Sequence, residues 1–237
     1  MTDPLREAAQ TMTTVRDRCV WTQRITHGDL VPYLVEESAE LIDAVEEGSR
    51  ADLREELGDL LWQVLFHAEI ASRDPDDPFD IDDVARGLTE KMVRRHPHVF
   101  AGEVAETPEQ VLVLWNAAKA LEKHERRSVL DGVSERMPSL ALAQKLLGKA
   151  DAVGIAPPTP PRAQDTPAHE SADPGDLDAR PAWATTVRSV GSEEELGEAL
   201  LALVGSARDN GWDAERALRE RLRALQADIR AAEARGR

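Results

Sequence analysis

The sequence predicts an all-α protein, and three observations support that fold class. Alternating β-branched runs, the usual signal of strands, are nearly absent from the 237 residues. Apolar residues recur instead at the three- and four-residue spacing of amphipathic helices, and capping and stop signals flank these segments. A hydrophobic content of 41% is enough to bury a core, so a folded helical body is expected.

The first two predicted helices form an αα-hairpin around Gly48. Residues 30–46 carry apolar side chains on one helical face: Leu34, Leu41 and Val45. Gly48 is a typical residue at the end of a helix. Ser49, followed three residues later by Asp52, is a typical N-cap pair, so the second helix is expected over residues 50–72.

Punctuation residues delimit the remaining predicted helices. Asp-Pro pairs at residues 74–75 and 77–78 indicate a loop. Thr107-Pro108 reads as an N-cap followed by a first-turn proline. The remaining helices are expected over these ranges: about 80–96, ending before Pro97; 108–124; 139–153; and helical segments within 192–234.

The composition divides the chain into three parts. Residues 1–155 form the main predicted domain, with seven of the nine aromatic residues. Residues 156–191 hold seven of the fourteen prolines and are predicted to be a flexible linker. Residues 192–237 contain Glu194-Glu195-Leu196-Gly197-Glu198, which matches Glu55-Glu56-Leu57-Gly58-Asp59 and indicates a partial, degenerate second copy of one helical unit.

The charge excludes some classes of partner. The chain has 45 acidic and 29 basic residues, for a net charge of -16. This excess disfavours nucleic acid and anionic membranes as partners, but a bound metal can still attract a phosphorylated small molecule. The only cysteine, Cys19, cannot form an internal disulfide, and the apolar run 60–68 is too short to span a bilayer. A cytoplasmic protein is therefore expected.

Two acidic clusters flank the predicted turn: Glu36-Glu37-x-x-Glu40 and Glu55-Glu56-x-x-Asp59. Glu40 and Glu56 both lie eight residues from Gly48, and Glu37 and Asp59 both lie eleven residues from it. Since a helix rises about 1.5 Å per residue, an antiparallel hairpin brings these four carboxylates onto facing turns.

The leucine spacing indicates that these carboxylates point toward the packed side of the hairpin. Glu37 lies between Leu34 and Leu41, and Glu56 lies between Leu53 and Leu60. Crowded, half-buried carboxylates are unfavourable unless a cation neutralises them, and oxygen ligands suit Mg²⁺, with Mn²⁺ as a substitute. The alternatives are a solvated acidic face and a di-iron site, although di-iron bundles use Glu-x-x-His pairs that these clusters lack.

Five motifs follow one another between residues 19 and 154. They are Thr26-His27, Pro32-Tyr33-Leu34-x-Glu36-Glu37-x-x-Glu40, Arg54-Glu55-Glu56-Leu57-Gly58-Asp59-Leu60, Glu90-Lys91-x-x-Arg94-Arg95-His96-Pro97-His98-Val99-Phe100, and Trp115-x-x-x-Lys119. In this order they resemble the motifs of MazG-type nucleoside triphosphate pyrophosphohydrolases. The resemblance implies a MazG-like helical bundle completed by homodimerisation, and magnesium-dependent hydrolysis of nucleoside triphosphates to monophosphate and pyrophosphate.

The resemblance also implies roles for individual residues. The implied metal ligands are Glu37, Glu40, Glu56 and Asp59. The implied substrate-binding residues are Lys91, Arg94, Arg95, Trp115 and Lys119. Glu36 and Glu55 are candidates for the general base that accepts a proton from the attacking water.

Two readings compete with a broad-specificity, housecleaning hydrolase. One is a non-catalytic, metal-stabilised helical dimer that binds nucleotide or a protein partner, and the other is an enzyme restricted to dUTP or dCTP. The chain also departs from the family where Cys19-Val20-Trp21-Thr22 replaces the usual Cys-Pro-Trp-Asp. The second copy lacks a facing acidic cluster, so residues 192–234 are expected to be catalytically silent, and hydrolysis is expected to survive removal of residues 156–237.

Overall fold

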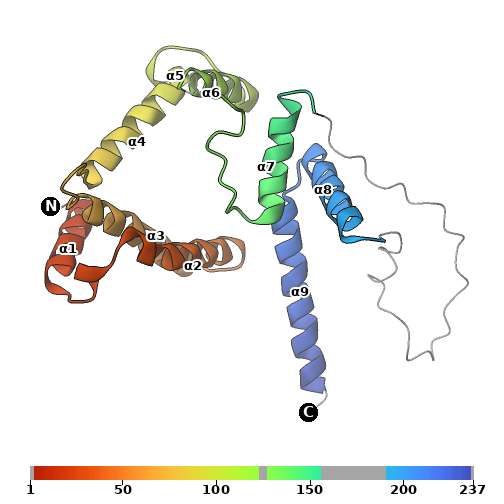
Figure 1. Ribbon diagram of the computed structural model, residues 1–237, viewed down its shortest axis with the longest axis horizontal. Helices are drawn as coiled ribbons and strands as arrows, with labels where there is room; N and C mark the ends of the chain where they lie inside the picture. Colours follow the sequence, from red (N-terminus) through yellow and green to blue (C-terminus); the bar gives the residue numbers. More distant parts are fainter. Residues whose placement is uncertain (1–2, 123–126, 156–190, 236–237) are drawn as a thin grey trace, which may run out of the picture. The chain divides into compact units, whose positions relative to one another are not determined.

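The computed structural model describes residues 3–122, 127–155 and 191–235, and every regular element in these ranges is a helix (Figure 1). The predicted all-α class is confirmed for this part of the chain. The helices form two compact units, Met1–His124 and Glu125–Arg237. The predicted domain of residues 1–155 therefore spans the boundary between the two units, and the predicted linker lies largely outside the described residues.

The first unit has its core where three helices meet: α1 (Pro4–Arg18), α2 (His27–Glu46) and α3 (Arg50–Ala71). The buried side chains of this core are Met12, Leu30, Leu65 and Phe66. The Arg16 guanidinium is also buried; it donates to the Ile25 carbonyl at 3.0 Å and lies over the Phe66 ring. No helix is predicted before residue 30, so α1 is an addition to the predicted fold.

The α2–α3 hairpin forms as predicted, and its caps are those that the sequence indicates. The Asp52 side chain accepts from the Ser49 N–H at 2.7 Å, and the Ser49 hydroxyl accepts from the Asp52 N–H at 3.2 Å. A Cβ atom at Gly48 would lie 2.7 Å from the Ala44 Cα, closer than real contacts allow. Gly48 is therefore required because the backbone of Ala44 leaves no room for a side chain. Its backbone conformation does not require glycine, since the φ angle of Gly48 is not positive.

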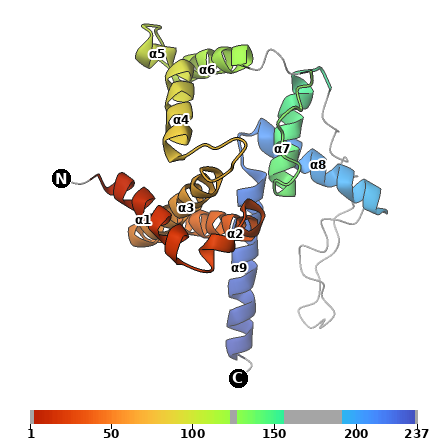
Figure 2. The ribbon, with the colours of Figure 1, turned by 60° about the vertical axis from the view of Figure 1, so that its left-hand side comes forward.

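The rest of the first unit forms a corner in which the chain turns back after α4 (Ile81–Arg95). The Asp80 side chain caps α4, and α5 (Pro97–Phe100) begins directly after His96. α6 (Pro108–Glu122) then packs against both α4 and α5. Figures 1 and 2 show α4 leading away from the α1–α3 core, so that α5 and α6 lie at its far end.

The second unit consists of α7 (Ser139–Asp151), α8 (Glu193–Asp209) and α9 (Ala214–Arg235). Leu147 of α7 is buried, as are Ala202 and Val204 of α8. The Gln144 amide donates to the Trp212 carbonyl at 3.0 Å, which ties α7 to the start of α9. α8 and α9 are separate helices because Gly211 has a φ of 71°, a conformation that ends a helix.

The helix boundaries agree closely with the predicted ones. α3 begins at Arg50, α6 begins at Pro108 and α7 begins at Ser139. Among the described helices, none has both the length and the apolar character needed to cross a bilayer.

Candidate active site

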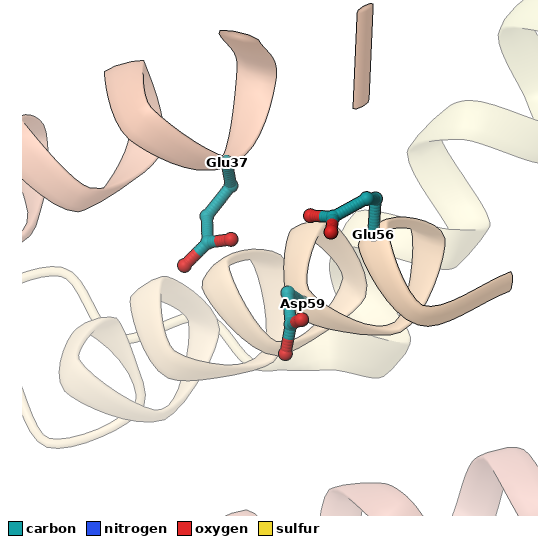
Figure 3. A group of neighbouring side chains, drawn as sticks. All are labelled: Glu37, Glu56 and Asp59. Atoms are coloured by element: carbon teal, nitrogen blue, oxygen red, sulfur yellow. The ribbon is translucent and has the colours of Figure 1, made fainter. Parts of the chain in front are cut away.

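The α2–α3 hairpin brings three of the four predicted metal ligands together. Glu37 extends from α2, and Glu56 and Asp59 extend from successive turns of α3 (Figure 3). One carboxylate oxygen from each of the three lies within 4.8 Å of the others. Helix spacing explains this placement: Glu56 and Asp59 are three residues apart and share a face, and α2 packs alongside that face.

Burial and mutual repulsion both act on this group. Loss of hydration raises the pKa of Glu37, and the neighbouring charges of Asp59 and Glu40 raise it further, while a hydrogen bond with Gln63 opposes the shift. The pKa of Glu56 is raised by the same causes, first desolvation and then the charge of Glu40. Without a neutralising cation, each of these carboxylates therefore destabilises the charged form of the others.

An unsatisfied oxygen supports a cation as the missing partner. Glu56 Oε2 is buried and has no hydrogen-bond partner among the described residues. A buried carboxylate oxygen without a donor is costly, and it prefers either a proton or a cation. Three carboxylates from two rigid helices form the all-oxygen donor set that a hard divalent ion prefers. The residues present therefore fit such an ion.

The other predicted acidic residues lie around this group. Glu40 is exposed and lies outside the three-carboxylate group, although its charge acts on both Glu37 and Glu56. Glu36 and Glu55, the candidates for the general base, are exposed on the same helices. They are therefore accessible to a water molecule beside the ligands.

The predicted substrate-binding residues gather in the α4–α6 corner. Arg94 and Arg95 occupy the last turn of α4, and the Arg95 guanidinium carbon lies 5.2 Å from the centre of the Trp115 ring. His96 meets the same indole edge-on, with ring centres 5.0 Å apart. Lys91 and Lys119 are half-buried on α4 and α6. Aromatic and cationic groups thus share one corner of the first unit.

Sequence reasoning missed Glu122, which pairs with both arginines of this corner. Its carboxylate accepts from Arg95 Nη2 at 2.5 Å and from Arg94 Nη2 at 3.0 Å. The pairing with Arg95 and Arg94 lowers the pKa of Glu122 to about 2. A signal was present in the sequence, because Glu122 lies seven residues after Trp115 and therefore on the same face of α6.

The carboxylate group and the basic corner remain separate within the described residues. No hydrogen bond or ion pair joins the two clusters there, and α4 carries the corner away from the hairpin (Figure 1). A ligand that used both clusters of one chain would therefore have to bridge them, or the clusters would have to come from different copies.

Comparisons with known proteins connect this site to a family. Residues 25–100 match the MazG nucleotide pyrophosphohydrolase domain. The nucleoside triphosphate pyrophosphohydrolase of Escherichia coli K12 is 36% identical over 220 residues, which are 92% of this chain and 81% of that protein.

Other relatives align over shorter stretches. The nucleoside triphosphate pyrophosphohydrolase of Mycobacterium tuberculosis is 49% identical over 64% of this chain and 46% of its own length. An uncharacterized 26.1 kDa protein of Streptomyces cacaoi is 55% identical over 64% of this chain and 63% of its own length. The chain thus spans about half the length of the mycobacterial relative.

A solved structure, that of a mazG-related protein from Thermotoga maritima, aligns with a TM-score of 0.43 at 25% identity, covering 48% of this chain and 97% of that one. The matched domain includes both acidic clusters and the basic end of α4, and the Escherichia coli alignment extends over most of both chains. Because the Escherichia coli relative is 36% identical over 92% of this chain and 81% of its own length, the chain belongs to the MazG nucleotide pyrophosphohydrolase family.

Proposed function

We propose that this protein hydrolyses nucleoside triphosphates to nucleoside monophosphate and pyrophosphate, and that the reaction requires Mg²⁺. The observation that carries the proposal is the facing group of Glu37, Glu56 and Asp59, in which one Glu56 oxygen is buried and has no partner in the part of the chain that the structure describes. The names of the Escherichia coli and Mycobacterium tuberculosis relatives support the same activity.

In this proposal the three carboxylates hold the ion, and Glu40 adds a fourth carboxylate beside them. When bound, Mg²⁺ supplies Lewis-acid activation of a phosphate oxygen and of water, and Mn²⁺ is expected to substitute for it. Glu36 or Glu55 accepts the proton of the attacking water, since both are exposed beside the ligands. The rigid hairpin fixes these groups before the substrate arrives.

The basic corner is proposed to bind the rest of the nucleotide. Lys91, Arg94 and Lys119 offer positive charge to the triphosphate. Trp115 offers an aromatic face for the base, and stacking of this kind accepts every base because each has a π-face. This supports broad specificity, as in a housecleaning enzyme, over restriction to one nucleotide.

Homodimerisation is also proposed, because the hairpin leaves apolar side chains uncovered in the described chain. The most exposed are Val35 at 63%, Val45 at 64% and Leu57 at 52%. A second copy that packs its hairpin against this one would cover them, and it would also supply a second basic corner. The separation of the two clusters within one chain is consistent with a site completed by a partner.

The test is a pyrophosphate-release screen over the common ribo- and deoxyribonucleoside triphosphates, with Mg²⁺, with Mn²⁺ and with a chelator. We expect equal amounts of monophosphate and pyrophosphate from several bases, and none with the chelator. Activity on dUTP or dCTP alone would contradict broad specificity. No release from any nucleotide, with metal-dependent stabilisation retained, would favour the non-catalytic helical dimer.

A further inference from the structure

The corner between α4 and α6 is organised around one carboxylate, that of Glu122. Arg95 donates to it through Nε at 3.1 Å and through Nη2 at 2.5 Å. Arg94 donates to the other oxygen through Nε at 3.1 Å and through Nη2 at 3.0 Å. One carboxylate therefore accepts two forked pairs of hydrogen bonds, and the trio keeps a net positive charge.

The two arginines of this trio differ in burial. The side chains of Arg95 and Glu122 are 15% and 19% exposed, whereas that of Arg94 is 55% exposed. A half-buried, forked ion pair is held more firmly than an exposed one, because water competes less for its hydrogen bonds. Arg95 is thus the fixed member of the trio, and Arg94 is the accessible one.

The fixed arginine lies against the indole of Trp115. Its guanidinium occupies one face of the ring, at 5.2 Å from the centre, and His96 meets the ring edge-on. Trp115 and Glu122 lie on the same face of α6, so Arg95 is held between them. The indole face under the Arg95 guanidinium is therefore not available to a base.

The accessible arginine borders an open space. Arg94 and Glu122, with Ala118 and Leu121, line a hollow of about 480 Å³. Arg94 uses Nε and Nη2 for its fork to Glu122, so among the described residues its Nη1 amino group is still available to donate. An anionic oxygen entering the hollow would meet that donor.

We propose that Glu122 is a positioning residue of the nucleotide site, which fixes Arg95 on one face of Trp115 and holds Arg94 beside the hollow for a phosphate. This inference rests on the proposed function, because it assigns the corner to nucleotide binding. It gives different roles to two arginines that are adjacent in the same motif. Arg95 packs against Trp115 and fixes the stacking surface, and Arg94 contacts the substrate.

The opposite reading is that Glu122 imitates a phosphate and competes with the substrate for the arginines. The burial of Arg95 and Glu122 argues against it, since side chains that are 15% and 19% exposed leave a phosphate little access to the hydrogen bonds of this pair. The two readings predict opposite changes in affinity when the carboxylate becomes an amide.

The experiment compares Glu122→Gln with the wild type in the full-length chain, using steady-state pyrophosphate release and calorimetric binding of a non-hydrolysable triphosphate analogue. Because charge-assisted hydrogen bonds are lost, we expect KM and the analogue Kd to rise about tenfold or more, with kcat within about twofold. Glu103→Gln is the matched control, since it removes the same charge from an exposed loop of the same unit.

A double-mutant cycle separates positioning from a general loss of structure. If Glu122 acts through Arg95, then Glu122→Gln adds little to the Kd of Arg95→Ala, although it has a large effect in the wild-type background. If Glu122→Gln does not fold, Glu122→Asp, which keeps the charge and shortens the side chain, is measured in the same cycle. Additive effects of the two substitutions would overturn the positioning of Arg95 by Glu122.

Each remaining outcome is also decisive. A lower Kd for Glu122→Gln would establish competition instead of positioning, and an unchanged Kd would overturn both readings of Glu122. A wild type that binds the analogue without releasing pyrophosphate would contradict the proposed hydrolysis but not the role of Glu122, which the Kd ratio still decides. A wild type that neither binds nor hydrolyses would overturn both proposals.

Discussion

α3 and α8 carry nearly the same acidic pentapeptide, yet the two copies place their carboxylates in different settings. Glu56 is the seventh residue of α3 and faces α2, where it joins Glu37 and Asp59. Its counterpart Glu195 is only the third residue of α8, and its Oε2 accepts from the Gly191 N–H at 2.6 Å. Among the described residues, Glu56 Oε2 has no hydrogen-bond partner, whereas the Glu195 carboxylate accepts from the N–H of the residue that precedes the N-cap of its own helix.

The difference shows that position along a helix decides what an acidic motif can do. A carboxylate in the first turn is satisfied by the free N–H groups of the helix start. A carboxylate in the second turn finds no free N–H groups, so it must meet solvent, a proton or a cation. The predicted silence of the second copy stays a prediction, because the segment before α8 lies outside the described residues, but the capping role of Glu195 supports it.

The largest expected effect tests this comparison at the two matched glutamates. Glu56→Gln should lower kcat by about 100-fold or more, because an amide oxygen is a poorer ligand for a divalent cation. Glu195→Gln should change kcat by less than about twofold, since its carboxylate only caps α8. Pyrophosphate release at saturating Mg²⁺ measures both. Equal losses in the two variants would mean that both copies belong to one site.

The second prediction compares the cores of the two units. Phe66 is 2% exposed at the centre of the first unit, so Phe66→Ala should lower its free energy of unfolding by about 3–5 kcal/mol. Leu147→Ala should destabilise the second unit by roughly 2 kcal/mol, because leucine loses a smaller side chain than phenylalanine does. Hydrogen exchange resolved by segment measures each unit. Slower hydrogen exchange of the α3 amides in either variant, or an equal loss of protection throughout the chain, would contradict the division into two separately stable units.

The same physical distinction explains what the sequence could predict. The hairpin was predictable because its signals are local: Ser49 and Asp52 cap α3, and the spacing of the two acidic clusters about Gly48 follows from the helix rise alone. The close approach of Glu37, Glu56 and Asp59 follows from the same arithmetic, although Glu40 lies outside that group.

Long-range partners were not predictable in this way. α1 belongs to the core because Met12 is buried together with Leu30 and Phe66. The residues around Met12 do not by themselves indicate that contact. The ion pairs of Glu122 with Arg94 and Arg95 were not predicted, because they depend on how the chain turns between α4 and α6. The break between α8 and α9 depends on one glycine, Gly211, in a segment that is helical on both sides.

The third prediction concerns the pH dependence of the α4–α6 corner. The folded pKa of Glu122, about 2, lies below the ordinary glutamate value of 4.5, so the unfolded chain binds a proton more readily. The stabilisation from Glu122 is therefore complete above about pH 5 and declines as the pH falls from 4.5 toward 2. Urea midpoints of the wild type and Glu122→Gln should differ at pH 6, and the difference should shrink as the pH falls toward 2. A difference that grows on acidification would contradict this pairing.

The smallest effect on turnover is expected from removing residues 156–237. This truncation removes α8 and α9, but it leaves the hairpin, the basic corner and α7. Turnover should stay within about twofold of the full chain, because the core of the first unit contains no residue from α8 or α9.

The hydrogen exchange of α7 in the truncated chain provides a second measurement. Leu147 loses the helices against which it is buried, so the amides of α7 should exchange faster while those of α3 keep their protection. Retained turnover with a loosened α7 would assign catalysis to the first unit alone. Loss of turnover with α3 still protected would show that the degenerate copy supports the site, and that capping by Glu195 is not its only contribution.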